Sequence, residues 1–218
     1  MIIILFFGIR RSGNHFVISQ IINNFKNIVH MNDVELSYTE YNIYKNIEIT
    51  QPSIDLKYTG FKNAECVIIS MENKIIDFNE LQKFNSEKNV YSIILLRNPY
   101  NMAASSWKRY NKNIHCTKEM IDLWILYANI FIENNNLFKI LYDEFNVNEN
   151  YAYNILNIII KNPIIDKNIK ITHQFSSFND NNSQNSYGNI EDCIYYNDPD
   201  FIQLFNDINI IKNIWNKI

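Results

Sequence analysis

Apolar and polar residues follow one another along the chain in blocks that predict strands and helices in alternation. An apolar run over residues 2–7 ends at Gly8, a short polar segment follows, and apolar residues then return at helical spacing. The returning apolar residues are Phe16, Val17, Ile18, Ile21 and Ile22. This pattern predicts a strand, a loop framed by Gly8 and Gly13, and a helix that Ser12 or Asn14 would cap.

The remaining sequence continues this pattern. The further predicted strands are 27–31, 66–70, 90–96 and 138–142. Further helices are predicted over about 78–84, 99–110 and 149–160, and a long helix is predicted to begin with Thr117 as its cap. Asp198 opens the last predicted helix, and its inward-facing residues are Phe201, Leu204, Phe205, Ile208, Ile211 and Trp215. Residues 36–62 and 176–189 are polar without a clear period, and we expect them to shape a substrate entrance. Alternating strands and helices predict an α/β fold with a parallel sheet flanked by helices.

Composition is that of an ordinary globular chain. The 218 residues are 47% hydrophobic and 20% charged, with a net charge of −3, so we expect one domain over residues 1–218 and no dedicated nucleic-acid binder. Three dispersed cysteines without a C-x-x-C pair suit a reducing compartment. The first apolar run is too short to span a membrane and has no basic residues before it. We therefore expect a soluble, cytoplasmic protein.

The first loop has the frame of a phosphate-binding loop but not its nucleotide chemistry. Residues 8–13 give the spacing G-x-x-x-x-G, which turns backbone N–H groups toward an anion at a helix N-terminus. A nucleoside triphosphatase has Lys and then Ser or Thr after the second glycine, whereas this chain has Asn14 and His15. Positive charge lies inside the loop instead, as Arg10 and Arg11. The sequence thus predicts an anion site that is not built for magnesium triphosphate.

A second polar pair follows the strand predicted over 90–96. Arg97 stands at the end of that strand, and Ser105 lies on the next helix, on a face that can return toward the arginine. A guanidinium and a hydroxyl can bind a second phosphate, some distance from the first loop. Because ligands of parallel sheets lie at the carboxyl ends of strands, we expect residues 8–13, Glu72 and Arg97 to open at one edge.

Residues 8–16 (GIRRSGNHF) and 97–105 (RNPYNMAAS) together resemble the two-part cofactor signature of the sulfotransferases. Residues 140–145 (ILYDEF) are similar to a further strand end of that family, so the resemblance covers roughly residues 2–160. It implies a three-layer fold like that of P-loop NTPases, with 3′-phosphoadenosine 5′-phosphosulfate (PAPS) as donor. It also implies two groups of cofactor-binding residues, namely Arg10, Arg11, Ser12, Gly13, Asn14 and His15 for the 5′ end, and Arg97 and Ser105 for the 3′-phosphate.

The resemblance implies transfer of a sulfuryl group to a hydroxyl or amine acceptor without a metal. Arg11, which stands where the family usually has Lys, would stabilise the leaving phosphate electrostatically, since arginine does not donate a proton at ordinary pH. Three positions compete for the general base that takes the acceptor's proton. Glu72 follows a strand where one branch of the family has its His, His30 and Asp33 lie near the place of another branch's Glu, and His15 lies in the loop itself.

Two other functions fit parts of the pattern. A degenerate P-loop kinase or nucleotide-binding protein would bind ATP or GTP with Mg²⁺, and an inactive scaffold would keep the fold without turnover. For the sulfotransferase we expect a small-molecule or carbohydrate acceptor and no nucleic acid.

Side chains outside the two motifs are expected to be structural. These are the core residues Trp107, Trp124 and Trp215, the surface residues His115 and His173, and the pair Asp143 and Glu144.

Overall fold

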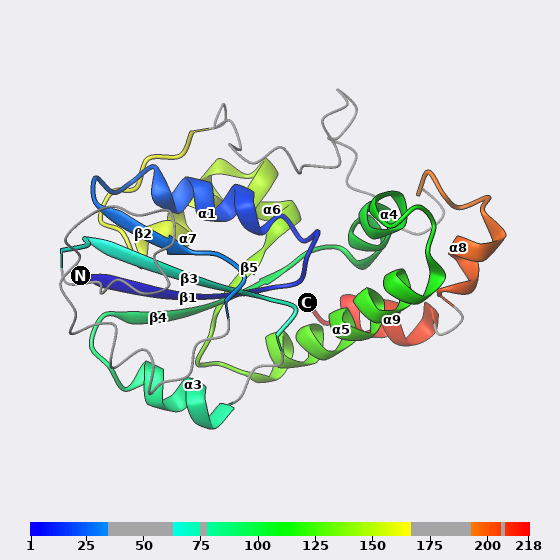
Figure 1. The fold of residues 1–218 in the computed structure, drawn as a ribbon, viewed down its shortest axis with the longest axis horizontal. Helices are drawn as coiled ribbons and strands as arrows, with labels where there is room; N and C mark the ends of the chain where they lie inside the picture. Colours follow the sequence, from blue (N-terminus) through cyan, green and yellow to red (C-terminus); the bar gives the residue numbers. More distant parts are fainter. Residues whose placement is uncertain (35–62, 75–77, 167–192, 206–207) are drawn as a thin grey trace.

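A parallel sheet of five strands forms the centre of the computed structural model, which describes residues 1–34, 63–74, 78–166, 193–205 and 208–218 (Figure 1). The strand order is β2-β3-β1-β4-β5. The strands are β1 (Ile2–Gly8), β2 (Ile28–Met31), β3 (Cys66–Glu72), β4 (Val90–Leu96) and β5 (Phe138–Leu141). All five predicted strands are confirmed, but β3 extends as far as Glu72 and β5 ends at Leu141, because Tyr142 begins a short helix.

The central position of β1 follows from its sequence. Residues 3–8 are buried, and a strand that is apolar on both sides needs neighbours on both edges and a layer on both faces. At its carboxyl end, Gly8 pairs with Glu72 of β3 and with Leu95 of β4. The register therefore brings the ends of β1, β3 and β4 to one edge of the sheet, as the sequence predicted.

Helices cover both faces of the sheet. They are α1 (Asn14–Ile22), α3 (Phe78–Asn85), α4 (Pro99–Arg109), α5 (Ile114–Glu133), α6 (Tyr142–Val147), α7 (Glu149–Asn157), α8 (Pro199–Gln203) and α9 (Ile208–Trp215). On one face, Ile4 and Phe6 of β1 belong to a buried cluster with α1 and α7. On the other face, Leu5 and Phe7 belong to a cluster with α3, α4, α5 and α9, and Figure 1 shows α3 and α5 on the side of the sheet opposite α1. The predicted three-layer α/β architecture is confirmed.

Two helix predictions need correction. The long helix α5 begins at Ile114 because the side chain of Asn113 accepts a hydrogen bond from the Cys116 N–H, so the cap is Asn113 and not Thr117, which is buried inside the helix. The predicted last helix is two helices, α8 and α9. Its predicted cap is confirmed, because Asp198 accepts from the Phe201 N–H.

The structural side chains are mostly where they were expected. Trp107 and Trp124 are buried in the core, and Trp215 is half-buried with its ring centroid 6.2 Å from that of Trp124. The buried residues of the last two helices are Phe201, Leu204, Phe205 and Ile211. His115 is exposed. The side chain of Ile208, residue His173 and the segments 36–62 and 176–189 lie outside what the structure describes.

Candidate anion-binding site

The loop between β1 and α1 is shaped by its two glycines. Gly13 has φ of 90°, and a Cβ there would lie 2.1 Å from Cε2 of Tyr142. A Cβ on Gly8 would lie 2.1 Å from Oδ1 of Asn14. Any larger residue would therefore displace Tyr142 or Asn14, and at Gly13 it would also have to adopt a left-handed backbone. The frame predicted from the sequence is a real constraint on this loop.

The first turn of α1 offers donors to an anion. Gly13 itself is the N-cap and no side chain caps the helix, so the predicted cap by Ser12 or Asn14 is wrong. Within the described residues, the backbone N–H groups of Gly13 and Asn14 have no acceptor, and the fully buried Ser12 Oγ has no hydrogen-bond partner. Helix N-termini with such groups attract negative charge.

Asn14 does not cap the helix because its side chain is bound elsewhere. Its Nδ2 donates to the Ile9 carbonyl over 3.2 Å and to Oε1 of Glu72 over 2.9 Å. The amide thus ties the loop to the end of β3 and leaves the helix N-terminus open.

Arg11 joins the two predicted halves of the site. Its Nε donates to Ser105 Oγ over 3.2 Å, and its carbonyl accepts from Nη1 of Arg97 over 3.0 Å. The Arg97 guanidinium also lies over the Tyr142 ring, 4.9 Å from the centroid. Arg97 and Ser105 were expected some distance from the loop, but both contact it through Arg11. The two motifs therefore form one continuous polar cluster.

The charges of two further arginines act on Arg11. Burial lowers the pKa of Arg11, and the charges of Arg109 and, to a smaller extent, Arg97 lower it further. Sequence reasoning missed Arg109. The signal was present, because Arg109 follows Ser105 by one turn on the same helix face.

Arg97 and the start of α4 are held by neighbouring side chains. The Trp124 indole donates to the Arg97 carbonyl over 2.8 Å. Asp143 accepts from the Asn98 N–H over 2.7 Å and from Nδ2 of Asn101 over 3.2 Å. The structural role expected for Asp143 is confirmed, and it fixes the position from which Arg97 approaches the loop.

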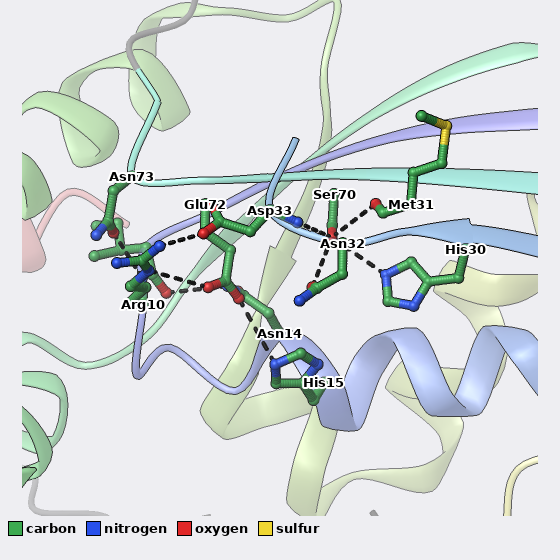
Figure 2. Close-up of polar contacts among 11 residues, drawn as sticks. Arg10, Asn14, His15, His30, Met31, Asn32, Asp33, Ser70, Glu72 and Asn73 are labelled. Atoms are coloured by element: carbon green, nitrogen blue, oxygen red, sulfur yellow. Dashed lines mark hydrogen bonds and ion pairs between the residues drawn. The ribbon is translucent and has the colours of Figure 1, made fainter. Parts of the chain in front are cut away.

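Arg10 is engaged on the side of β2 and β3 (Figure 2). Its guanidinium forms an ion pair with Asp33, and its Nε lies 3.5 Å from Oε2 of Glu72. The backbone N–H of Arg10 donates to Asn73 Oδ1 over 2.8 Å. Burial lowers the pKa of Arg10, but its contact with Asp33 and the charge of Glu72 raise it by more. In contrast to Arg11, this arginine already has carboxylates for its charge.

The candidate bases are only partly brought together. Glu72 Oε1 lies 3.9 Å from Nε2 of His15, and the exposed fractions of the two side chains are 11% and 33%. Asp33 reaches the same cluster through Arg10. His30 instead places Nε2 3.2 Å from Ser70 Oγ and stands apart from Glu72 (Figure 2). The structure thus groups Glu72, His15 and Asp33 and leaves His30 outside the group.

Fold and site together define a parallel α/β protein with a P-loop-like, arginine-lined loop. The described residues include no group of three or more His, Cys, Asp or Glu side chains placed to hold a metal ion. None of the helices described in the structure has the length and apolarity needed to cross a membrane.

Comparison of the sequence with family models and with curated proteins finds no match. Among solved structures, the chain is similar to a mouse sulfotransferase in complex with PAP, with a TM-score of 0.47 and 15% identity. The similarity covers 76% of this chain and 61% of the mouse chain, so this protein spans less than two thirds of that neighbour's length.

Proposed function

We propose that the protein is a sulfotransferase that moves a sulfuryl group from PAPS to a hydroxyl or amine acceptor. The observation that carries the proposal is the double contact of Arg11 with Ser105 and Arg97. This contact joins the loop at the α1 N-terminus to α4, so a ligand with two separate anionic groups could bind both at once. Adenosine nucleotides with a 5′- and a 3′-phosphate have this charge pattern.

The loop residues fit the 5′ end of such a ligand. The buried Ser12 hydroxyl, which has no partner in the part of the chain that the structure describes, would donate to it together with the N–H groups of Gly13 and Asn14. Arg11 would neutralise its charge. His15 belongs to the same first turn of α1. Arg10 would contribute at longer range, because two carboxylates already face it.

The α4 side fits a second anion. Arg97 and Ser105 would bind the 3′-phosphate, with the Arg97 guanidinium supported from below by the Tyr142 ring. When bound, PAPS would supply a sulfuryl group attached to a phosphate leaving group. A sulfuryl group carries less negative charge than a phosphoryl group, so guanidinium and N–H donors suffice to stabilise the charge that develops. Arg11 would act there electrostatically and not as a proton donor.

Glu72, assisted by His15, is the proposed proton acceptor for the incoming hydroxyl or amine. The two side chains lie together at the end of β3, next to the loop, whereas His30 is bound to Ser70. Asn14 and Arg10 hold the Glu72 carboxylate in one orientation, which keeps it beside the first turn of α1.

The direct test is formation of PAP (3′-phosphoadenosine 5′-phosphate) from PAPS with a panel of phenols, sugars and amines. We expect acceptor-dependent PAP release that is lost in Arg11→Ala and kept in Lys88→Ala, a matched loss of charge at an exposed position. PAP binding without turnover for any acceptor would favour the inactive scaffold. Release of ADP from ATP with Mg²⁺ would favour the kinase.

A further inference from the structure

Asp33 follows β2 and binds the side chain of Arg10 in the loop between β1 and α1 (Figure 2). The same guanidinium places Nε 3.5 Å from Oε2 of Glu72. Since β2 and β3 are neighbours in the sheet, one cation is shared by two carboxylates from adjacent strand ends. Asp33 takes the hydrogen bond of Arg10, and Glu72 receives the guanidinium at longer range.

The backbone holds both partners of this ion pair in place. The N–H of Asp33 donates to Oγ of the buried Ser70 over 3.4 Å, and that hydroxyl donates to the Met31 carbonyl over 3.3 Å. The Arg10 N–H donates to Asn73 Oδ1 over 2.8 Å. Two anchored backbones therefore set the geometry of the pair, in contrast to a pair of long side chains on an open surface.

The two oxygens of Glu72, the proposed proton acceptor, have different neighbours. Oε1 accepts from Asn14 Nδ2 over 2.9 Å and lies 3.9 Å from His15 Nε2, whereas Oε2 faces Arg10. A guanidinium in full contact with a carboxylate stabilises its ionised form and so makes it a weaker proton acceptor. Because Asp33 binds Arg10, the guanidinium stays at 3.5 Å from Oε2 and leaves room for the proton of an incoming hydroxyl or amine.

Two simpler roles of Asp33 predict different behaviour. If Asp33 accepted the proton itself, its effect on the rate would not depend on Arg10. If the ion pair only stabilised the loop, its loss would weaken nucleotide binding and slow the reaction together. The coupling of Asp33 to Arg10, measured on rate and on affinity, distinguishes these roles.

We propose that Asp33 is a positioning residue that acts through Arg10 to keep Glu72 available as the proton acceptor. This inference rests on the proposed function. It gives Asp33, a residue outside both sequence motifs, a role other than that of the proton acceptor for which the sequence made it a candidate. Removal of its charge slows sulfuryl transfer and leaves the nucleotide site intact.

The test is a double-mutant cycle of Asp33→Asn and Arg10→Gln. Asparagine is nearly isosteric with aspartate and tolerates the left-handed backbone of Asp33, which has φ of 50°. For each protein we would measure PAP affinity by calorimetry and the rate of PAP formation in a single turnover, with protein in excess over PAPS and an acceptor from the panel above. A single turnover removes product release from the measured rate.

We expect Asp33→Asn to lower the single-turnover rate by about fivefold, the scale of a partly exposed charge pair, and to leave PAP affinity within about twofold. In the Arg10→Gln background, Asp33→Asn should change the rate by less than about twofold, because the guanidinium that Asp33 holds is absent. The matched control is Asp122→Asn, which removes one partner of the exposed 2.8 Å ion pair with Lys118 on α5. It should change neither rate nor affinity.

An equal effect of Asp33→Asn on the rate with and without Arg10 would overturn the inference and favour Asp33 as the proton acceptor. A loss of PAP affinity as large as the loss of rate would also overturn it, since the pair would then be structural. An unchanged rate in Asp33→Asn, with wild-type protein active, would overturn the inference and leave the proposed function standing. Wild-type protein that forms PAP with no acceptor would overturn both.

Discussion

Replacement of Gly13 by alanine tests the geometry of the loop most sharply. The residue sits between the loop and α1 with φ of 90°, and its added Cβ would lie 2.1 Å from Cε2 of Tyr142. The alanine would be strained by its backbone and would also displace a ring that is packed under Arg97 and against Phe16.

The magnitude follows from these two contributions. A left-handed backbone costs an L-residue roughly 1–2 kcal/mol, and overpacking by a methyl group costs roughly 1–3 kcal/mol. Gly13→Ala should therefore lower the free energy of unfolding by about 2–5 kcal/mol, a large share of the roughly 5–15 kcal/mol of a typical protein. PAP affinity should fall as well, because the shift of Tyr142 moves the Arg97 guanidinium.

Urea unfolding of wild type, Gly13→Ala, Tyr142→Ala and the double variant separates the two contributions. In the Tyr142→Ala background the steric clash is gone, so Gly13→Ala should cost only the backbone strain of about 1–2 kcal/mol. A cost of Gly13→Ala that is the same with and without the tyrosine ring would refute the steric argument. A cost below about 0.5 kcal/mol, the scale of an ordinary surface substitution, would refute the loop conformation itself.

Three further predictions concern the site and its surroundings. Arg97→Ala should weaken PAP binding by roughly 2–3 kcal/mol in calorimetric titration, the scale of a lost charge-assisted contact, and unchanged affinity would remove Arg97 from the site. Glu72→Gln should lower the rate of PAP formation from PAPS by at least about tenfold with little change in PAP affinity, and full activity would exclude Glu72 as the proton acceptor. The hydrogen bond from Lys112 lowers the pKa of Asp198 below its ordinary value of 3.8. The carboxylate therefore stabilises the fold above pH 3.8, and this stability is lost as the pH falls through the lowered pKa. The difference in unfolding free energy between wild type and Asp198→Asn should shrink over that range, and a pH-independent difference would contradict the assignment.

The strands and the anion loop could be predicted because their causes are local. An apolar run such as residues 2–7 has to be buried whatever its partners are, and Gly8 and Gly13 mark the close approaches of the loop by their own lack of a side chain. Likewise, the Asp198-Pro199 pair signals a helix start without reference to the rest of the chain.

The sequence-based predictions fail where a side chain is bound by residues far away in the sequence. Asn14 is a favourable cap by type, but Glu72, which lies 58 residues away in sequence, binds its side chain. Arg10 is a loop cation by sequence, yet its carboxylate partner Asp33 comes from the end of another strand. The charge of Arg109 acts on Arg11 because α4 stays helical for a full turn beyond Ser105. Such pairings depend on the register of the sheet and the docking of α4, which local patterns do not specify.

The proposed function requires that one continuous site binds a 3′-phosphorylated adenosine nucleotide. Thermal unfolding of the protein with PAP, compared with ADP and ATP with and without Mg²⁺, measures this binding, because a ligand that binds only the folded state raises its stability. We expect a rise in the unfolding temperature with PAP that is the same with and without Mg²⁺, and little change with ADP. A rise only with ATP and Mg²⁺, or no rise with any nucleotide, would contradict it.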